Sequence, residues 1–366
     1  MEHMIRVLTD RWTVFIPVLA ALALAATWGR SLSGVAVVAV AAALIGAVLA
    51  AVYHAEVVAH RVGEPFGSLV LAVAVTIIEV ALIVTLMISG GDKAASLARD
   101  TVFAAVMITC NGIFGLSLLV GALRRRVAVF NAEGTGAALA TVATLATLSL
   151  VLPTFTTSQS GPEFSAGQLA FAAVASLALY GLFVMVQTVR HPDDFLPVEG
   201  NGVVTDDDEH SESPTSKAAL LSLAMLFVAL VCVVGLAKVV SPSIESAVAD
   251  AGLPPSAVGV VIALLVLLPE TLAAVRAARR DQVQISLNLA LGSAMASIGL
   301  TIPAIAVATI WLDGPLELGL GATQMVLLAL TIVVGVLTVV PGRATLLQGG
   351  VHLALFSAFV FLAASP

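Results

Sequence analysis

Long, almost uncharged apolar runs fill this chain, and they restrict its fold more than any other feature. A helix needs about 20 apolar residues to cross the hydrocarbon core of a bilayer. Runs of this kind predict eleven transmembrane helices, at roughly 12–29, 34–53, 66–89, 101–123, 134–153, 168–189, 218–240, 255–275, 282–311, 318–340 and 343–364. Only 11% of the residues are charged. This composition excludes a soluble enzyme and a nucleic-acid-binding protein with a basic face.

The loops between the runs predict the orientation of the chain. Loops that carry more Lys and Arg stay in the cytoplasm. With a cytoplasmic N-terminus, twelve of the 16 basic residues fall on the cytoplasmic side. The four on the opposite side are Arg30, Lys93, Arg99 and Lys238. We therefore expect a multi-pass protein with its N-terminus in the cytoplasm, its C-terminus outside and an odd number of spans.

An acidic segment at 190–217 divides the chain. It contains eight acids together with Pro and Gly, so it predicts a mobile cytoplasmic loop. Six predicted spans precede it and five follow it. The expected organisation is an N-terminal helix at 1–30, a five-helix repeat at 31–189, the loop, and a second five-helix repeat at 218–366. Two such units with five spans each have opposite orientations in the membrane, which is typical of transporters.

Two acids, Glu79 and Glu270, lie well inside the predicted spans. Each is in the second span of its five-span unit. Glu79 follows Glu64, at the start of its span, by 15 residues, and Glu270 follows Pro254 by 16. The sequence therefore predicts that the two carboxyl groups reach similar depths from opposite sides.

The chemistry of these two carboxyl groups predicts exchange. A charge at the centre of a spanning helix costs roughly 2.5–3.5 kcal/mol on insertion scales. Protonation or a bound cation removes this cost, and Ca²⁺, or a monovalent cation with one proton, competes with two protons for the pair. We therefore expect Glu79 and Glu270 to bind metal cations and protons alternately. The alternative is that each glutamate forms hydrogen bonds that hold helices together.

Further oxygen atoms are needed, since Ca²⁺ takes 6–8 oxygen ligands. Pro269 removes a backbone donor immediately before Glu270 and predicts a break in that helix. Four side chains are additional candidate ligands for the cation: Thr76, Asn111, Ser293 and Ser297. Close helix packing is the alternative explanation for the small residues among them.

Other polar residues are weaker candidates. Glu56 and Glu64 can form a cation entrance or a solvated interface, and Asp206, Asp207, Asp208 and Glu209 can attract or sense cations or remain solvated. His352 is alone in the last predicted span, and we expect it to be a hydrogen-bonded structural residue. We expect no cofactor. An intramembrane enzyme would need a clustered motif, and the chain has no HExxH and no Asp that is predicted to be buried.

Two stretches of the chain resemble a known family. The residues HAEVVAHRVGEPFGSLVLAVAVTIIE at 54–79 and PETLAAVRAARRDQVQISLNLALGSAMASIGLTIPAI at 269–305 are similar to the two repeat motifs of the Ca²⁺/cation antiporter superfamily. The resemblance is strongest to its Ca²⁺/H⁺ exchanger branch and to bacterial ChaA-type cation/proton antiporters. It covers nearly the whole chain after the first helix, and it implies alternating access with Glu79 and Glu270 as the cation and proton carriers.

The chain departs from the family pattern at two places. The usual Gly-Asn before each membrane glutamate is replaced by VTII and VLLP, and Asn111 stands where the first repeat usually has Ser. The expected function is therefore a secondary Ca²⁺/H⁺ antiporter of a bacterial inner membrane that can also accept Na⁺ and K⁺. The alternatives are a Na⁺(K⁺)/H⁺ antiporter without a calcium role, and a cation channel. Its expected partners are the lipid bilayer, inorganic cations and protons.

Deletion of residues 199–213 tests the interpretation of the acidic segment. We expect the deletion variant to retain exchange and to change at most its rate or cation dependence, because the carboxyl carriers lie elsewhere. Proton flux in vesicles, measured with a pH-sensitive dye, checks this. Loss of all transport in a correctly inserted variant would mean that the loop is part of the transport machinery.

Overall fold

A computed structural model describes residues 2–30, 32, 34–62, 66–90, 95–198, 214–254, 256–311 and 314–365. It describes side chains over the same ranges except 2–11, 66–73, 75, 86, 89–90 and 256. Five of the predicted entrance or regulatory acids, Glu64, Asp206, Asp207, Asp208 and Glu209, therefore lie outside the described residues.

The described residues fold into membrane-spanning helices. Eight helices are long and apolar enough to cross a bilayer, and a bent pair brings the number to as many as nine. Shorter apolar stretches at Trp12–Thr27 and Thr76–Thr85 belong to α1 (Glu2–Thr27) and α3 (Phe66–Gly90). Together these segments coincide with the eleven predicted runs. The all-helical membrane class is therefore confirmed.

The chain forms two compact units, each of which draws on both halves of the sequence. Unit 1 comprises α1, α2 (Gly34–Val62), α3 and α8 (Ser216–Asp250), and unit 2 comprises the remaining elements. The predicted repeats are defined by sequence order rather than by packing, so their boundaries stay a prediction. Helix α8 continues ten residues past its predicted end at 240, because a helix does not have to end where its apolar run ends.

A proline shapes the packing of unit 1, in which α2 contacts both α1 and α8. Pro17 lies inside α1 and has no N–H, so the carbonyl group of Thr13 loses its usual helical donor. The buried His54 of α2 replaces that donor, with its Nε2 atom 2.9 Å from the Thr13 oxygen. This bond joins α2 to α1 and assigns the Nε2 proton.

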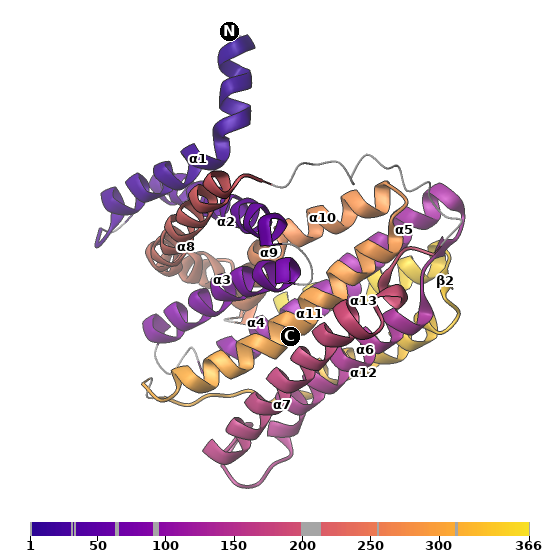
Figure 1. The fold of residues 1–366 in the computed structure, drawn as a ribbon. Coiled ribbons are helices and arrows are strands. Elements are labelled where there is room, and N and C mark those ends of the chain that lie inside the picture. The colour runs from indigo at the N-terminus through magenta and orange to yellow at the C-terminus, as the bar shows by residue number, and fades with distance from the viewer. Residues whose placement is uncertain are drawn as a thin grey trace. The chain divides into compact units, whose positions relative to one another are not determined.

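Unit 2 has a long central span, Leu97–Arg125, which is the most buried of the candidate spans in the described residues. It consists of α4 (Leu97–Met107), a π-helical segment at Ile108–Ile113 (hereafter the π segment) and α5 (Phe114–Arg125). The other helices are α6 (Ala132–Ala146), α7 (Ala166–Met185), α9 (Ser256–Val266), α10 (Leu268–Arg279), α11 (Val283–Ala308), α12 (Ala322–Val339) and α13 (Leu346–Ala364). A π turn at Thr147–Val151 extends α6, and α12 lies beside α6 (Figure 1).

Contacts between loops of unit 2 test the number of spans. The short strands β1 (Ala128–Val129) and β2 (Arg343–Ala344) pair with each other, and Arg125 forms an ion pair with Asp281. Eleven spans place all of these loops on one side of the membrane. The Ala95 carbonyl group, which accepts a hydrogen bond from the Glu317 N–H, lies with it on the opposite side. Loss of any one span from the fourth to the tenth would have separated the members of at least one pair, so these contacts support the predicted alternation of sides over that part of the chain.

A pair of glycines brings α5 and α13 close together. A Cβ atom at Gly115 would lie 2.7 Å from the His352 Cβ, and one at Gly349 would lie 2.8 Å from the backbone N of Leu119. Neither distance is compatible with an unshifted neighbour. Small residues permit this approach, as is common between membrane helices.

Substitution of adjacent glycines on α13 tests this packing. Gly349→Ala should lower stability by about 1–3 kcal/mol because the added methyl group meets backbone atoms. Gly350→Ala is the matched control, since a Cβ there meets nothing within 4 Å. Thermal unfolding in detergent should show a lower Tm for the first variant alone. Equal Tm values would mean that α5 and α13 are not closely packed.

Candidate cation and proton site

Glu270 lies at a break between two helices. The stretches Ala257–Val266 and Leu268–Arg279 are bent by 54°, and Glu270 occupies the first turn of α10 directly after Pro269. The predicted interruption at Pro269 is therefore confirmed. Because Pro269 cannot donate, the Leu265 carbonyl group four residues earlier loses its usual helical partner.

The position of Glu270 also explains how a carboxylate is tolerated there. A helix N-terminus carries about half a positive charge, and it stabilises an anion in its first turn. Glu270 is half-buried at this end of α10. The N-terminus of α10 thus stabilises the negative charge of the Glu270 carboxylate. Helix α9, which precedes it, contains no Lys or Arg that could do so.

The register of α10 and α11 relates Glu270 to the predicted serine ligands. Ser286 of α11 is hydrogen-bonded to the Ala274 carbonyl group of α10 at 2.7 Å. Glu270 lies about 6 Å beyond Ala274, and Ser293 lies about 10 Å beyond Ser286 in the same direction, because the two helices are antiparallel. A glutamate side chain points back toward the helix N-terminus, so the Glu270 carboxylate extends toward the level of Ser293.

Asn111, in the π segment, is fully buried and hydrogen-bonded to two other helices. Its Nδ2 atom donates to Thr331 Oγ1 of α12 at 2.9 Å, and its Oδ1 atom lies 3.2 Å from His352 Nδ1 of α13. His352 Nε2 lies 3.2 Å from Thr338 Oγ1. The predicted structural role of His352 is therefore confirmed.

The hydrogen bonds of this network determine which of its atoms carry the protons. Thr331 donates to the Leu327 carbonyl at 2.8 Å, so its oxygen accepts from the Asn111 amide. The Asn111 oxygen then faces His352 Nδ1, which carries the proton, and Nε2 of the neutral ring accepts from Thr338. His352 thereby occupies one of the two lone pairs of Asn111 Oδ1.

The helices of unit 2 that carry the predicted cation ligands contact one another. The π segment packs against α10 and α11, and α10 packs against α11. Unit 2 therefore brings together the helices that hold Asn111, Glu270, Ser293 and Ser297. Ser297 is buried and Ser293 is half-buried.

Unit 1 holds the other candidates, Thr76 and Glu79. Both lie on α3 and are buried, with Glu79 only 4% exposed. A spacing of three residues puts them on the same face of the helix. Helix α3 is continuous from Phe66 to Gly90, so the two glutamates differ in their local backbone.

Of the two predicted entrance residues, Glu56 of α2 lies within the described residues. Glu56 is exposed, as an entrance residue or a solvated interface residue would be. His54, two residues earlier, is buried and bound to the Thr13 carbonyl, so it belongs to the packing of α1 against α2.

One buried acid was missed from the sequence. Asp100 is 5% exposed and occupies the first turn of α4, so the expectation of no buried Asp is wrong. Its carboxylate accepts hydrogen bonds from Arg99 Nε at 2.9 Å, Ser96 Oγ at 2.9 Å and Gln324 Nε2 at 3.3 Å. Burial was not predicted because Asp100 precedes the apolar run. An Arg-Asp pair directly before a buried helix was the available signal.

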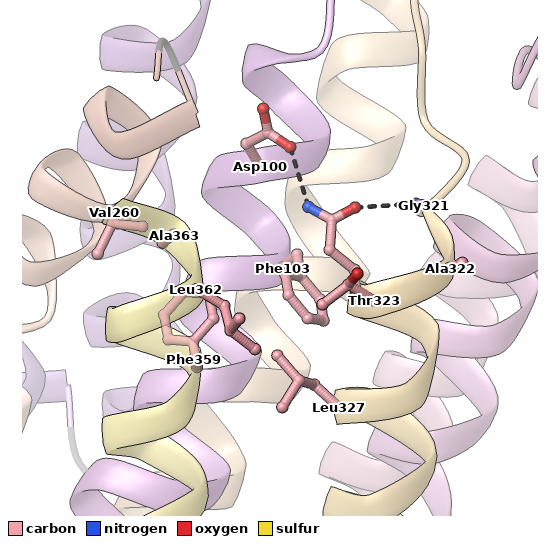
Figure 2. A pocket seen from close by; sticks show the side chains of 11 residues that line it. Asp100, Phe103, Val260, Gly321, Ala322, Thr323, Leu327, Phe359, Leu362 and Ala363 are labelled. Carbon is pink, nitrogen blue, oxygen red and sulfur yellow. Dashed lines mark hydrogen bonds between the residues drawn. The ribbon is translucent and has the colours of Figure 1, made fainter. Parts of the chain in front are cut away.

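Asp100 borders a cavity of about 210 Å³. Figure 2 shows the carboxylate bound to the Gln324 amide, with Phe103, Leu327 and Phe359 forming an apolar wall. Arg99 also donates to the Gly319 carbonyl at 3.2 Å and pairs with Glu317. Because the charge of Asp100 is balanced by Arg99, this carboxylate stabilises the end of unit 2 rather than providing a free ligand.

A multi-pass helical fold with acids in apolar spans is typical of membrane transporters, and comparison with known proteins specifies the family. The chain matches the sodium/calcium exchanger protein family over residues 14–189 and 221–364. It belongs to this family, whose members are exchangers rather than enzymes.

Individual relatives cover nearly the whole chain. A protein of Sinorhizobium fredii named as an ionic transporter is 46% identical over 97% of this chain and 96% of its own length. The sodium-potassium/proton antiporter ChaA of Escherichia coli is 36% identical over 95% of this chain and 94% of its own. The crystal structure of the H⁺/Ca²⁺ exchanger CAX has the same fold, with a TM-score of 0.68 at 14% identity over 99% of this chain and 89% of that one.

A double-mutant cycle tests the Asn111–His352 bond. Asn111→Ala and His352→Ala should each lower stability by about 1–3 kcal/mol, because each leaves a buried polar partner unsatisfied. The double variant should cost less than the sum of the two single variants. Thermal unfolding measures all three, and Ser357→Ala, whose hydroxyl bonds only its own helix, is the control. Strictly additive effects would contradict a direct bond.

Proposed function

We propose that this protein is a secondary antiporter that exchanges cations for protons by alternating access, with Glu79 and Glu270 as the carriers. The observation that carries the proposal is the burial of Glu79 in an apolar helix whose sequence contains no Lys or Arg. A carboxylate in that position is unstable as a bare anion. A proton or a bound cation removes this cost, and exchange between the two is the proposed transport reaction.

Charge balance explains why the two ions compete. Two carboxylates are neutralised by two protons, by one divalent cation, or by one monovalent cation and one proton. Each of these loaded states can exist in an apolar environment, whereas the empty dianion is costly. A transporter that changes its access only when the pair is neutralised exchanges the ions rather than leaking them, which favours an antiporter over a channel.

The remaining ligands are proposed to differ between the units. In unit 2, the Leu265 carbonyl group and the hydroxyl groups of Ser293 and Ser297 supply oxygens near Glu270, together with the remaining lone pair of Asn111. In unit 1, Thr76 supplies a hydroxyl one helical turn from Glu79. These are hard oxygen donors, which suit Na⁺, K⁺ and Ca²⁺.

Two cation classes are favoured by different observations. Na⁺ and K⁺ are favoured by the name of the E. coli relative, which is 36% identical. Ca²⁺ is compatible with the two membrane carboxyl groups, because one divalent cation neutralises both of them. The distribution of Lys and Arg and the bacterial relatives support a bacterial inner membrane with a cytoplasmic N-terminus and an outer C-terminus.

Removing the charge of either carrier should stop exchange. Glu79→Gln and Glu270→Gln should each abolish cation-dependent proton flux, because a glutamine cannot bind or release a proton. The exposed Glu133→Gln is the matched control and should transport normally. Proteoliposomes with a pH-sensitive dye, challenged separately with Na⁺, K⁺ and Ca²⁺, provide the measurement.

The same assay separates the possible outcomes. A response to Ca²⁺ that Glu79→Gln eliminates would assign calcium exchange, and a response to Na⁺ or K⁺ alone would assign monovalent exchange. Wild-type transport by either glutamine variant would refute the carrier role. A wild-type protein that responds to none of the three cations would refute proton-coupled exchange.

A further inference from the structure

Two buried threonines in unit 2 have hydroxyl groups without a hydrogen-bond partner among the described residues. A threonine in a helix commonly donates its hydroxyl hydrogen to the carbonyl group four residues earlier. In the described residues, eight threonines make this bond: Thr27, Thr109, Thr141, Thr144, Thr147, Thr188, Thr271 and Thr331. Thr101 of α4 and Thr301 of α11 do not.

Both of these hydroxyl groups are completely buried. Thr101 and Thr301 are each 0% exposed, and neither Oγ1 atom has a hydrogen-bond partner among the described residues. A buried hydroxyl without a partner is unfavourable, and the carbonyl groups of Leu97 and Ser297 are in the usual position to relieve it. Neither bond is made, so both hydroxyl groups can bind a partner outside their own helix.

Thr301 continues the line of candidate ligands on α11. Ser293, Ser297 and Thr301 are spaced four residues apart and share one face of the helix. Thr301 lies about 12 Å beyond Ser293 along the axis. This direction leads from the level of Glu270 toward the C-terminal end of α11.

Thr101 marks the same end of unit 2. It follows Asp100, which borders the cavity, and α4 contacts α11 directly. Arg99 binds the Gly319 carbonyl in the segment that follows α11. The two unpartnered hydroxyls therefore lie on contacting helices, between the end of the unit and the serines near Glu270.

We propose that Thr301 and Thr101 are hydroxyl ligands of a partly hydrated cation on its route between this end of unit 2 and Glu270. Each hydroxyl oxygen replaces a water molecule of the hydration shell as the ion passes. The inference rests on the proposed exchange function and adds two positions to it. The same oxygens suit Na⁺, K⁺ and Ca²⁺, so the route itself does not select among them.

Valine substitutions test the route, because valine has the shape of threonine without the hydroxyl. Thr301→Val and Thr101→Val should raise the cation concentration for half-maximal proton flux by about tenfold, which corresponds to about 1.4 kcal/mol. Their Tm values should equal or exceed that of the wild type, since no protein hydrogen bond is lost. Thr301→Ser keeps the hydroxyl and should restore transport. Thr144→Val, which removes a hydroxyl bound to its own helix, should leave flux unchanged.

The outcomes are separable from those of the proposed function. If Glu270→Gln is inactive while both valine variants transport with wild-type half-saturation, the route is wrong and the exchanger stands. A clear fall in Tm in the valine variants would also overturn the route, because it would mean that the hydroxyls have structural partners. Normal flux in Glu270→Gln would instead refute the proposed function itself.

Discussion

The rest of the structure depends on the cost of an unpaired polar group in hydrocarbon. Helices satisfy the backbone, but each buried polar side chain needs its own solution. Unit 2 uses three: the charge of Asp100 is balanced by Arg99, Asn111 and His352 form a neutral network, and Glu270 lies at a helix N-terminus. The first two fix the packing of helices. The third stabilises an anion through the helix dipole.

Glu79 and Glu270 are therefore not equivalent. Glu270 has a helix N-terminus and a released carbonyl group, whereas Glu79 lies within a continuous helix with Thr76 on the same face. A carboxylate without helix-end stabilisation is the more costly anion.

The features that could be predicted from the sequence are those that depend on a local pattern of residues. The spans follow from apolar length, the break at Pro269 from a missing N–H, and the structural role of His352 from its isolation. The features that could not be predicted depend on contacts between residues that are far apart in the chain. Asn111 and Thr331 are 220 residues apart, so no local spacing reveals their bond. The burial of Asp100 likewise depends on Gln324 and on helices from the other half of the sequence.

The choice of cation then depends on oxygens rather than on charge. Two carboxyl groups can be neutralised equally by Ca²⁺ or by a monovalent cation with a proton. Ca²⁺ requires 6–8 oxygens, and His352 already occupies one lone pair of Asn111 Oδ1. A chain that lacks the family's asparagine before each glutamate has fewer side-chain oxygens near its carriers. Released carbonyls and water must complete the shell of Ca²⁺, whereas a monovalent cation, which binds its water less tightly, needs less from the protein.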